Sequence, residues 1–281
     1  MIFLGTGASE AIPCCFCDCV ACNDARTFKG KNIRSRCGFM IDEQNLIDFS
    51  PDIFKQCLDN NLVLSNLQNI FLTHTHDDHL DISELITINS SASNEQVNIY
   101  LSQAAAGMFT SVMEHYENTY GSYTTGYFKK IKLKVLNPYE TYRIDERLVT
   151  PIQSTHRSYG KDEWGFNYLI QDKDNQTFLY ATDTGFYSEK AFAFLSGKRL
   201  NQLIIECTYG VDDTIDDSGH LSYRKMLKML DCFKECGIID YTTPIYVTHI
   251  SHVKPLVHEA LQGEFHKSNY HICVAYDGLV I

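Results

Sequence analysis

Four potential metal ligands lie close together in the first third of the chain, in the pattern H-x-H-x-D-H: His74, His76, Asp78 and His79. Neutral imidazole is the commonest metal ligand, and a carboxylate oxygen beside it suits a divalent cation. The apolar run 70–73 predicts a strand before them, so His74 and His76 can share one metal while Asp78 and His79 face a second. The alternative, a polar loop capping a helix from about residue 81, does not account for three imidazoles.

The cysteine-rich segment 14–22 is a second group of possible ligands. Five of its nine residues are cysteines, and Cys17, Cys19 and Cys22 have the spacing C-x-C-x-x-C. That spacing is typical of thiolates that share one tetrahedral Zn²⁺, and three thiolates leave one position for a ligand from elsewhere. The alternative is that these cysteines are buried as small hydrophobic residues. We expect that role, or a place near the site without ligation, for Cys14 and Cys15.

Isolated polar residues end several other predicted strands. His156 follows the extended run 142–153, Asp183 follows the apolar run 177–181, and His249 follows the apolar run 245–248. Taken alone, each is a weak signal, because a polar residue at a strand's end is more often a cap.

Two further histidines lie in suggestive places. His220 precedes the helix expected at 223–236, where the free N–H groups of a helix N-terminus can hold a phosphate. His252 lies three residues after His249 and is a candidate fourth ligand for the thiolates. A Cys₃His zinc site would tie the two ends of the chain together.

Composition predicts one large α/β domain spanning residues 1–281. The chain is 44% hydrophobic and 21% charged, and further strands are predicted at 38–41, 46–49, 97–101, 131–136, 166–171 and 203–209. Its net charge of −11 argues against nucleic acid as a partner. No signal peptide or membrane span is apparent, so we expect a cytoplasmic protein whose eleven cysteines favour metal ligation over disulfides.

The H-x-H-x-D-H pattern resembles the metal signature of the metallo-β-lactamase superfamily of binuclear hydrolases. This resemblance implies an αββα sandwich, in which two mixed β-sheets face each other with helices on the outer faces. It also implies the roles of the isolated residues: Asp48 supports the metal loop without ligating, and Asp183 bridges the two metals. The implied ligands of the first metal are His74, His76 and His156, and those of the second are Asp78, His79 and His249.

The additional zinc site makes the chain resemble the phosphodiesterases of phosphonate metabolism, which open phosphoribosyl 1,2-cyclic phosphate. The resemblance implies a small cyclic phosphodiester substrate, attacked by a metal-bridging hydroxide, with Asp78 and His220 as catalytic residues. It implies two divalent metals, zinc or manganese, at the catalytic centre and one structural zinc at Cys17, Cys19, Cys22 and His252. The Tyr-rich stretch 115–127 is expected to be a loop that serves as a lid, a homodimer contact or an ordinary surface.

Several other functions remain open at this point. A tRNA 3′-processing nuclease shares the metal ligands and a histidine like His220, although this acidic chain shows no basic arm. The same site could hydrolyse a thioester or a lactone. A cofactor-biosynthesis relative with impaired binuclear chemistry is disfavoured by the intact ligands. A non-enzymatic zinc-dependent binding or redox module built on 14–22 predicts metal at the cysteines and none at the His/Asp group.

Overall fold

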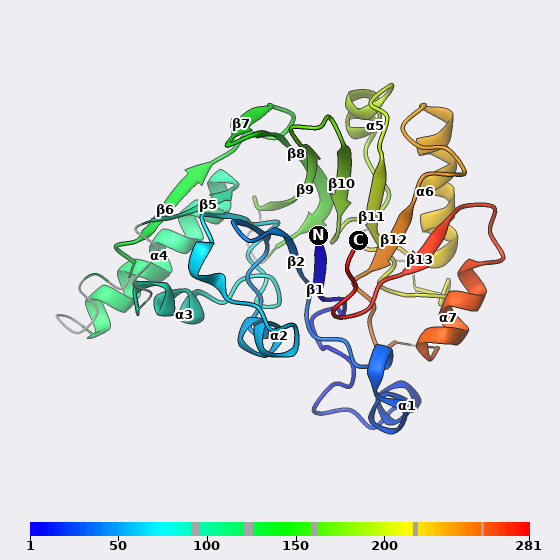
Figure 1. Cartoon of the computed structure of the whole chain (residues 1–281), viewed down its shortest axis with the longest axis horizontal. Coiled ribbons are helices and arrows are strands. Elements are labelled where there is room, and N and C mark those ends of the chain that lie inside the picture. Colours follow the sequence, from blue (N-terminus) through cyan, green and yellow to red (C-terminus); the bar gives the residue numbers. More distant parts are fainter. Residues whose placement is uncertain (91–95, 121–125, 127, 159–161, 216–218, 254–255) are drawn as a thin grey trace.

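Two mixed β-sheets lie face to face, with helices on their outer sides (Figure 1). The computed structural model describes residues 1–281 except 91–95, 121–125, 127, 159–161, 216–218 and 254–255. The first sheet has six strands in the order of the sequence: β1 (Ile2–Gly5), β2 (Gly38–Asp42), β3 (Asn45–Ile47), β4 (Asn69–Phe71), β5 (Val97–Leu101) and β6 (Ile131–Val135). Strands β1 to β3 pair antiparallel, and β3 to β6 pair parallel.

The second sheet has seven strands in reverse sequence order: β13 (Ile272–Val274), β12 (Ile245–Thr248), β11 (Gln202–Glu206), β10 (Thr177–Ala181), β9 (Trp164–Gln171), β8 (Arg147–Arg157) and β7 (Tyr142–Ile144). Strands β10 to β13 are parallel, whereas β7 to β10 pair antiparallel. Two reversals of direction give β8 the same direction as β10, so the carboxyl ends of β8, β10, β11 and β12 lie at one edge. That edge is where ligands bind in open α/β sheets.

The inner faces of the two sheets enclose a core rich in aromatic rings. Phe39 of the first sheet packs against Tyr180 of the second, with ring centroids 5.4 Å apart. Phe71 likewise contacts Tyr168, at 5.7 Å. Side chains alternate between the two faces of each strand, so every second residue points inward and contributes to this core between the sheets.

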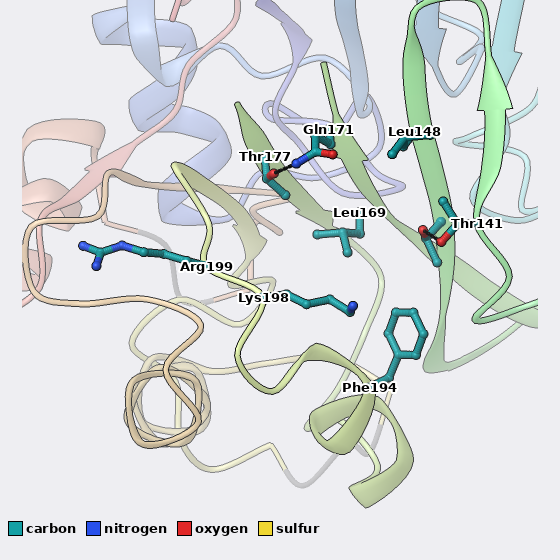
Figure 2. A pocket seen from close by; sticks show the side chains of 9 residues that line it. Thr141, Leu148, Leu169, Gln171, Thr177, Phe194, Lys198 and Arg199 are labelled. Atoms are coloured by element: carbon teal, nitrogen blue, oxygen red, sulfur yellow. Dashed lines mark hydrogen bonds between the residues drawn. The ribbon is translucent and has the colours of Figure 1, made fainter. Parts of the chain in front are cut away.

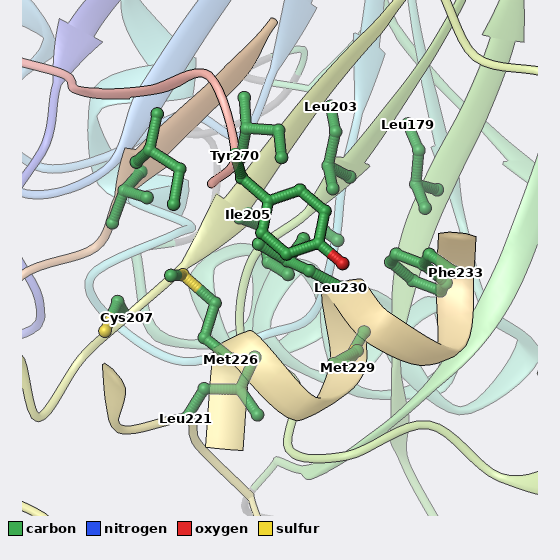
Figure 3. Close-up of a cluster of buried hydrophobic side chains, with 14 of the residues drawn as sticks. Leu179, Leu203, Ile205, Cys207, Leu221, Met226, Met229, Leu230, Phe233 and Tyr270 are labelled. Atoms are coloured by element: carbon green, nitrogen blue, oxygen red, sulfur yellow. The ribbon is translucent and has the colours of Figure 1, made fainter. Parts of the chain in front are cut away.

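Helices cover the outer faces. Helix α6 (Tyr223–Glu235) places Met226, Met229, Leu230 and Phe233 on one face, at helical spacing, against Leu179, Leu203 and Ile205 of the second sheet (Figure 3). Helices α1 (Val20–Phe28), α5 (Glu189–Leu195) and α7 (His258–Phe265) join the same core. Helices α2 (Ile53–Asp59), α3 (Ile82–Leu85) and α4 (Gln103–Tyr120) pack on the first sheet. Short 3₁₀ turns lie at Gly30–Asn32, Leu64–Asn66 and Ile86–Ser90.

The predicted αββα sandwich is confirmed, with local corrections. The extended run 142–153 is a hairpin of two strands, because Asp145 adopts a left-handed φ of 51° and turns the chain. Helix α4 continues to Tyr120, so the first part of the predicted Tyr-rich loop is helical; of the rest, 121–125 and 127 lie outside the described residues. Cys15 is exposed, so the first of its two expected roles, burial as a small hydrophobic residue, is wrong. Among the described helices, none is long and apolar enough to cross a bilayer.

Candidate metal centre

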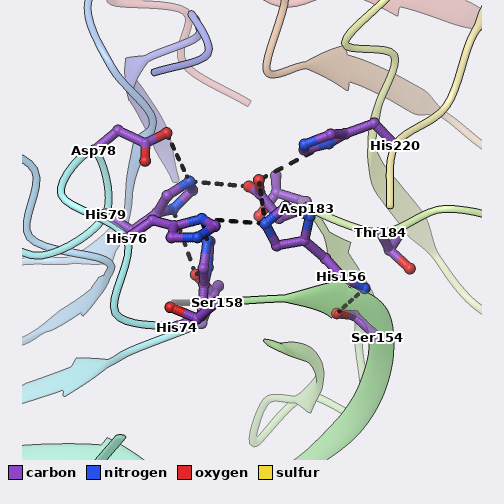
Figure 4. A network of polar contacts seen from close by, with 12 residues as sticks. His74, His76, Asp78, His79, Ser154, His156, Ser158, Asp183, Thr184 and His220 are labelled. Carbon is purple, nitrogen blue, oxygen red and sulfur yellow. Dashed lines mark hydrogen bonds and ion pairs between the residues drawn. The ribbon is translucent and has the colours of Figure 1, made fainter. Parts of the chain in front are cut away.

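Three imidazoles converge where β4 and β8 end (Figure 4). His76 Nδ1 lies 2.8 Å from His74 Nε2 and 3.1 Å from His156 Nε2. Nitrogens bound to one metal at about 2.0–2.1 Å stand about 2.9–3.4 Å apart. The separation of 3.1 Å lies within this range and that of 2.8 Å just below it, so both are close to what a shared cation requires. Burial and then His79 hold the pKa of His74 well below its ordinary value, and burial and then His156 lower the pKa of His76 to about 4. Both rings are therefore neutral, as ligation requires.

A second group lies beside the first. Asp183 Oδ2 is 2.9 Å from His79 Nε2 and 3.2 Å from His249 Nε2, and Asp78 Oδ2 is 3.2 Å from His79 Nε2. The other oxygen of Asp183 faces His156 Nε2 at 3.9 Å. One carboxylate therefore lies between the two groups, in the position of a bridging ligand.

The inner atoms of this second group are unsatisfied as they stand. Within the described part of the chain, no hydrogen bond of acceptable geometry reaches the buried His79 Nε2, His249 Nε2 or Asp183 Oδ2. Leaving such atoms without partners is costly unless a cation binds them. Burial by itself lowers the pKa of His79. The carboxylates of Asp183, Asp78 and Asp48 outweigh this effect and raise that pKa well above its ordinary value. The pocket thus attracts positive charge, and this donor set fits divalent cations such as Zn²⁺ or Mn²⁺.

The outer nitrogen of each central imidazole is held by a neighbouring side chain. His79 Nδ1 lies 2.6 Å from Asp48 Oδ2, and His249 Nδ1 lies 2.8 Å from Thr208 Oγ1. Thr73 donates its backbone N–H to Asp48 and has its hydroxyl 3.0 Å from His74 Nδ1. Such partners fix the tautomer and the ring orientation that present Nε2 to a metal. The geometry matches the supporting role predicted for Asp48.

Three of these residues adopt left-handed backbone conformations just after strands. The φ angles are 63° for Asp48, 49° for Asp183 and 56° for His249. Non-glycine residues rarely take this region, and such strain clusters at functional sites. The sharp turns aim side chains from the strand ends into one centre.

His220 lies against the centre and is paired with a buried carboxylate. Its Nδ1 is 2.9 Å from Glu206 Oε1 and 3.9 Å from Asp183 Oδ1. Glu206 also accepts the backbone N–H groups of Thr184 and Leu221. Burial by itself raises the pKa of Glu206. The effect of His220 outweighs burial and lowers that pKa below its ordinary value, so this carboxylate is ionised. An ionised carboxylate can only accept, so Nδ1 carries a hydrogen and Nε2 is the atom that can exchange a proton.

Sequence reasoning missed Glu206, which it treated as part of a buried apolar strand. The available signal was a charged residue within the run Leu203–Cys207, since a fully buried carboxylate demands partners. Thr208, whose hydroxyl is 2.5 Å from Glu206 Oε2, was missed for the same reason.

An open cavity of about 500 Å³ gives access to this centre. Its lining includes the candidate ligands His76, Asp78, His156, Asp183 and His249, together with His220. A separate cavity of about 280 Å³ lies on the second sheet, between Thr141, Gln171 and Lys198 (Figure 2). None of the candidate ligands lines it, so we assign it no part in the chemistry.

The structure also brings the predicted zinc ligands together. His252 Nδ1 is 3.5 Å from the sulfurs of both Cys19 and Cys22, and Cys17 completes the group. Tetrahedral zinc with bonds of about 2.3 Å to sulfur and 2.0–2.1 Å to nitrogen places these atoms about 3.6 Å apart. Burial by itself raises the pKa of Cys19. Hydrogen bonds from the backbone N–H of Cys22 and then from His252 outweigh burial and lower that pKa to about 6. This set fits Zn²⁺.

Comparisons with known proteins give the family. Residues 44–250 match the family model described as the beta-lactamase superfamily domain. The chain belongs to this superfamily. The expected resemblance to metallo-β-lactamase-fold hydrolases is therefore confirmed, and divalent metals are the cofactors of this family.

Individual relatives are more distant. Ribonuclease Z of Listeria innocua serovar 6a is 28% identical over 188 residues, which are 64% of this chain and 52% of that protein. The chain thus spans about half the length of this curated relative. The crystal structure of a "new diphosphatase from the PhnP family" has a TM-score of 0.71 at 20% identity and covers 99% of this chain and 94% of that one.

Two further solved structures share the fold over nearly the whole chain. Zn²⁺-bound PqqB from Methylobacterium extorquens has a TM-score of 0.73 at 17% identity, covering 99% of this chain and 98% of that one. The short form of human tRNase Z has a TM-score of 0.63 at 16% identity, covering 100% and 97%. At these identities the likeness concerns the fold alone.

Proposed function

We propose that the protein is a metal-dependent phosphodiesterase that acts on a small, cyclic phosphodiester of the phosphoribosyl 1,2-cyclic phosphate kind. The observation that carries the proposal is the His220–Glu206 pair: His220 lines the same cavity as the candidate metal ligands, and the buried Glu206 holds it from behind. A phosphodiester needs both electrostatic stabilisation at phosphorus and a proton for the leaving oxygen. The ligand cluster supplies the first requirement, and His220 supplies the second.

We assign the metal ligands as the two groups of the centre suggest. His74, His76 and His156 would hold the first metal, and Asp78, His79 and His249 would hold the second. Asp183, which has one oxygen toward each group, would be shared by both. Two divalent cations held there, zinc or manganese, would activate water and offset negative charge on the phosphate. Asp48, Thr73 and Thr208 orient the imidazoles from outside.

His220 acts on the leaving group. Hydrolysis forms one bond from the attacking oxygen to phosphorus and breaks the bond to the ester oxygen, which must gain a proton. The carboxylate of Glu206 favours the doubly protonated ring of His220, whose Nε2 then donates that proton. Asp78 lines the cavity, and its Oδ2 faces His79.

We assign Cys17, Cys19, Cys22 and His252 to a structural zinc. Its support is the closed set of four ligand atoms, which lie within 4.8 Å of one another. A site with four protein ligands leaves no open position for substrate. The zinc would anchor segment 14–22 beside the loop that carries His249.

RNA is the second candidate substrate, because a curated relative of the chain is a ribonuclease Z. Against it stands the net charge of −11, which repels a polyanion. Thioester hydrolysis would use the metals in the same way, but its thiolate leaving group would need no proton from a histidine. Lactone hydrolysis releases an alkoxide, which would need that proton, so only the substrate panel separates it from diester cleavage.

The deciding experiment measures turnover by metal-loaded protein on a panel of substrates. The panel contains a bis-aryl phosphate, five-membered cyclic phosphates, a precursor tRNA, a thioester and a lactone. We expect the unmodified protein to cleave the small diesters. The variant His76→Ala should cleave none of them. Cleavage of the tRNA alone would make the protein a nuclease, and activity only on the carbonyl substrates, with both metals bound, would overturn the phosphodiesterase assignment.

A further inference from the structure

A second cavity adjoins the one at the metal centre. It has a volume of about 600 Å³, and both cavities are lined by Ser9 and Asp78. Thr75 and Asp77, the chain neighbours of His76, also line the second cavity. A ligand held at the centre can therefore extend past Asp78 into this space, whose volume is that of a small-molecule site.

One wall of this cavity is an apolar face of helix α4. Met108, Val112 and Tyr116 line it at intervals of four residues, and Leu80 and Ile82 line it from the metal loop and α3. The ring of Tyr116 packs edge-on against Phe128, with centroids 5.9 Å apart. Because Tyr116 lines the cavity, part of the Tyr-rich stretch lies on the substrate side of the molecule. Apolar and aromatic walls of this kind bind flat, uncharged groups.

The charges in the cavity disfavour a second anion. Its single lining cation among the described residues, Arg36, is already engaged, because Nη1 lies 3.0 Å from Asp52 Oδ1 and Nε donates to the carbonyl of Ser9 at 2.9 Å. Asp77 and Asp81 add negative charge to the lining. These carboxylates would repel a phosphate placed here but would not repel an uncharged ring.

We propose that this cavity is the binding site for one ester substituent of the substrate, and that it selects an uncharged aromatic group. The inference rests on the proposed phosphodiesterase function and narrows its substrates to diesters with an uncharged aromatic group on this side. The further phosphate of a phosphoribosyl-type substrate would then have to lie outside this cavity. The reacting phosphate lies at the metal centre, and the aromatic substituent lies against Met108, Val112 and Tyr116. Substrates whose substituent carries a further phosphate at this position are disfavoured.

The test fills the cavity and compares ligands that differ only in the substituent. Val112→Trp places a large ring in the cavity, and Leu58→Trp, at an exposed position on α2, is the matched control. The probes are diphenylphosphinate and dimethylphosphinate, which have no ester bond to hydrolyse, and binding to metal-loaded protein is measured by calorimetry. We expect Val112→Trp to weaken diphenylphosphinate at least about tenfold and dimethylphosphinate by less than about twofold, because only the former needs the cavity.

Two further measurements separate the possible failures. Tyr116→Ala, which removes part of the wall without adding bulk, should weaken diphenylphosphinate about threefold or more and spare dimethylphosphinate. In turnover, Val112→Trp should lower kcat/KM for a bis-aryl phosphate more than for a methyl aryl phosphate. Equal effects on the two phosphinates in both variants would overturn the inference. If the unmodified protein cleaves no diester, the proposed function fails, and the phosphinate comparison still decides whether the cavity selects aromatic groups.

Discussion

His79 Nδ1 lies 2.6 Å from Asp48 Oδ2, and neither side chain is exposed to solvent. The carboxylate holds the hydrogen on Nδ1 and so presents Nε2 to Asp183 and to any metal. We expect Asp48→Asn to lower metal affinity at the His/Asp centre by about 10- to 100-fold, because the amide removes the negative charge that makes the imidazole a stronger ligand. Competition with a chelator of known affinity measures this loss.

The control for this change is Asp42→Asn. Asp42 pairs with Arg147 and lies outside the candidate centre, so its substitution tests for general effects of losing a carboxylate. If both variants retain metal as tightly as the unmodified protein, Asp48 has no part in orienting His79.

The pairing of His220 with Glu206 makes a prediction that depends on the leaving group. His220→Ala should lower kcat by about 10² to 10⁴ for a diester with an alkyl leaving group, because that oxygen needs a proton. The effect should be much smaller for 4-nitrophenolate, which leaves without one. Metal content should stay unchanged, as measured by mass spectrometry.

This variant also distinguishes two roles for the same side chain. His156, Asp183 and His220 lie close enough together to hold a cation. Loss of one metal from His220→Ala would make His220 a ligand instead of a proton donor. Glu206→Gln should reproduce the dependence on the leaving group in weaker form, whereas Tyr209→Phe, which keeps a ring beside His220, should not.

The four-ligand zinc site predicts a loss of stability with a defined stoichiometry. Cys22→Ser should remove one zinc per chain and leave the metals of the His/Asp centre in place. The melting temperature should fall markedly, since a structural zinc supplies on the order of 10 kcal/mol of apparent binding energy. Cys15→Ser is the matched control, because Cys15 is exposed and outside the group. A normal zinc count in Cys22→Ser would rule out this ligand.

The spacing of residues along the chain could predict only those members of the candidate centre that lie close together in the sequence. His74, His76, Asp78 and His79 lie in one loop after one strand, so their spacing alone indicates a shared purpose. His156, Asp183 and His249 could be chosen only through the resemblance, because their meeting point depends on how β8, β10 and β12 are ordered in the sheet. Spacing along the chain carries no information on that order.

The features that sequence did not predict depend on tertiary contacts. Glu206 meets His220 across fourteen positions, and nothing in the spacing of the two residues requires it. The turn between β7 and β8 lacks glycine and proline and relies on a left-handed Asp145. The cavity lined by Met108, Val112 and Tyr116 follows from helix α4 lying beside the metal loop, which a helical pattern by itself does not specify.

A buried histidine far from substrate predicts how stability depends on pH. His258 Nδ1 lies 3.1 Å from a nitrogen of the buried Arg34, which can only donate, so the imidazole accepts and is neutral. Burial and then Arg34 lower the pKa of His258 to about 4. The unfolded chain, with an imidazole pKa of about 6.5, therefore binds more protons between these values. The resulting stabilisation is complete above about pH 6.5 and is lost as the pH falls toward 4, at up to about 1.4 kcal/mol per pH unit.

His258→Gln isolates this contribution, because its amide oxygen can accept from Arg34 but does not titrate. Denaturant unfolding at a series of pH values from 7 to 4 should show the unmodified protein losing stability relative to this variant. Release of zinc in acid affects both proteins and cancels in the comparison. The exposed His266 provides the control substitution, His266→Gln, whose curve should run parallel to that of the unmodified protein. Parallel curves for His258→Gln as well would show that folding does not lower the pKa of His258, which would contradict the prediction.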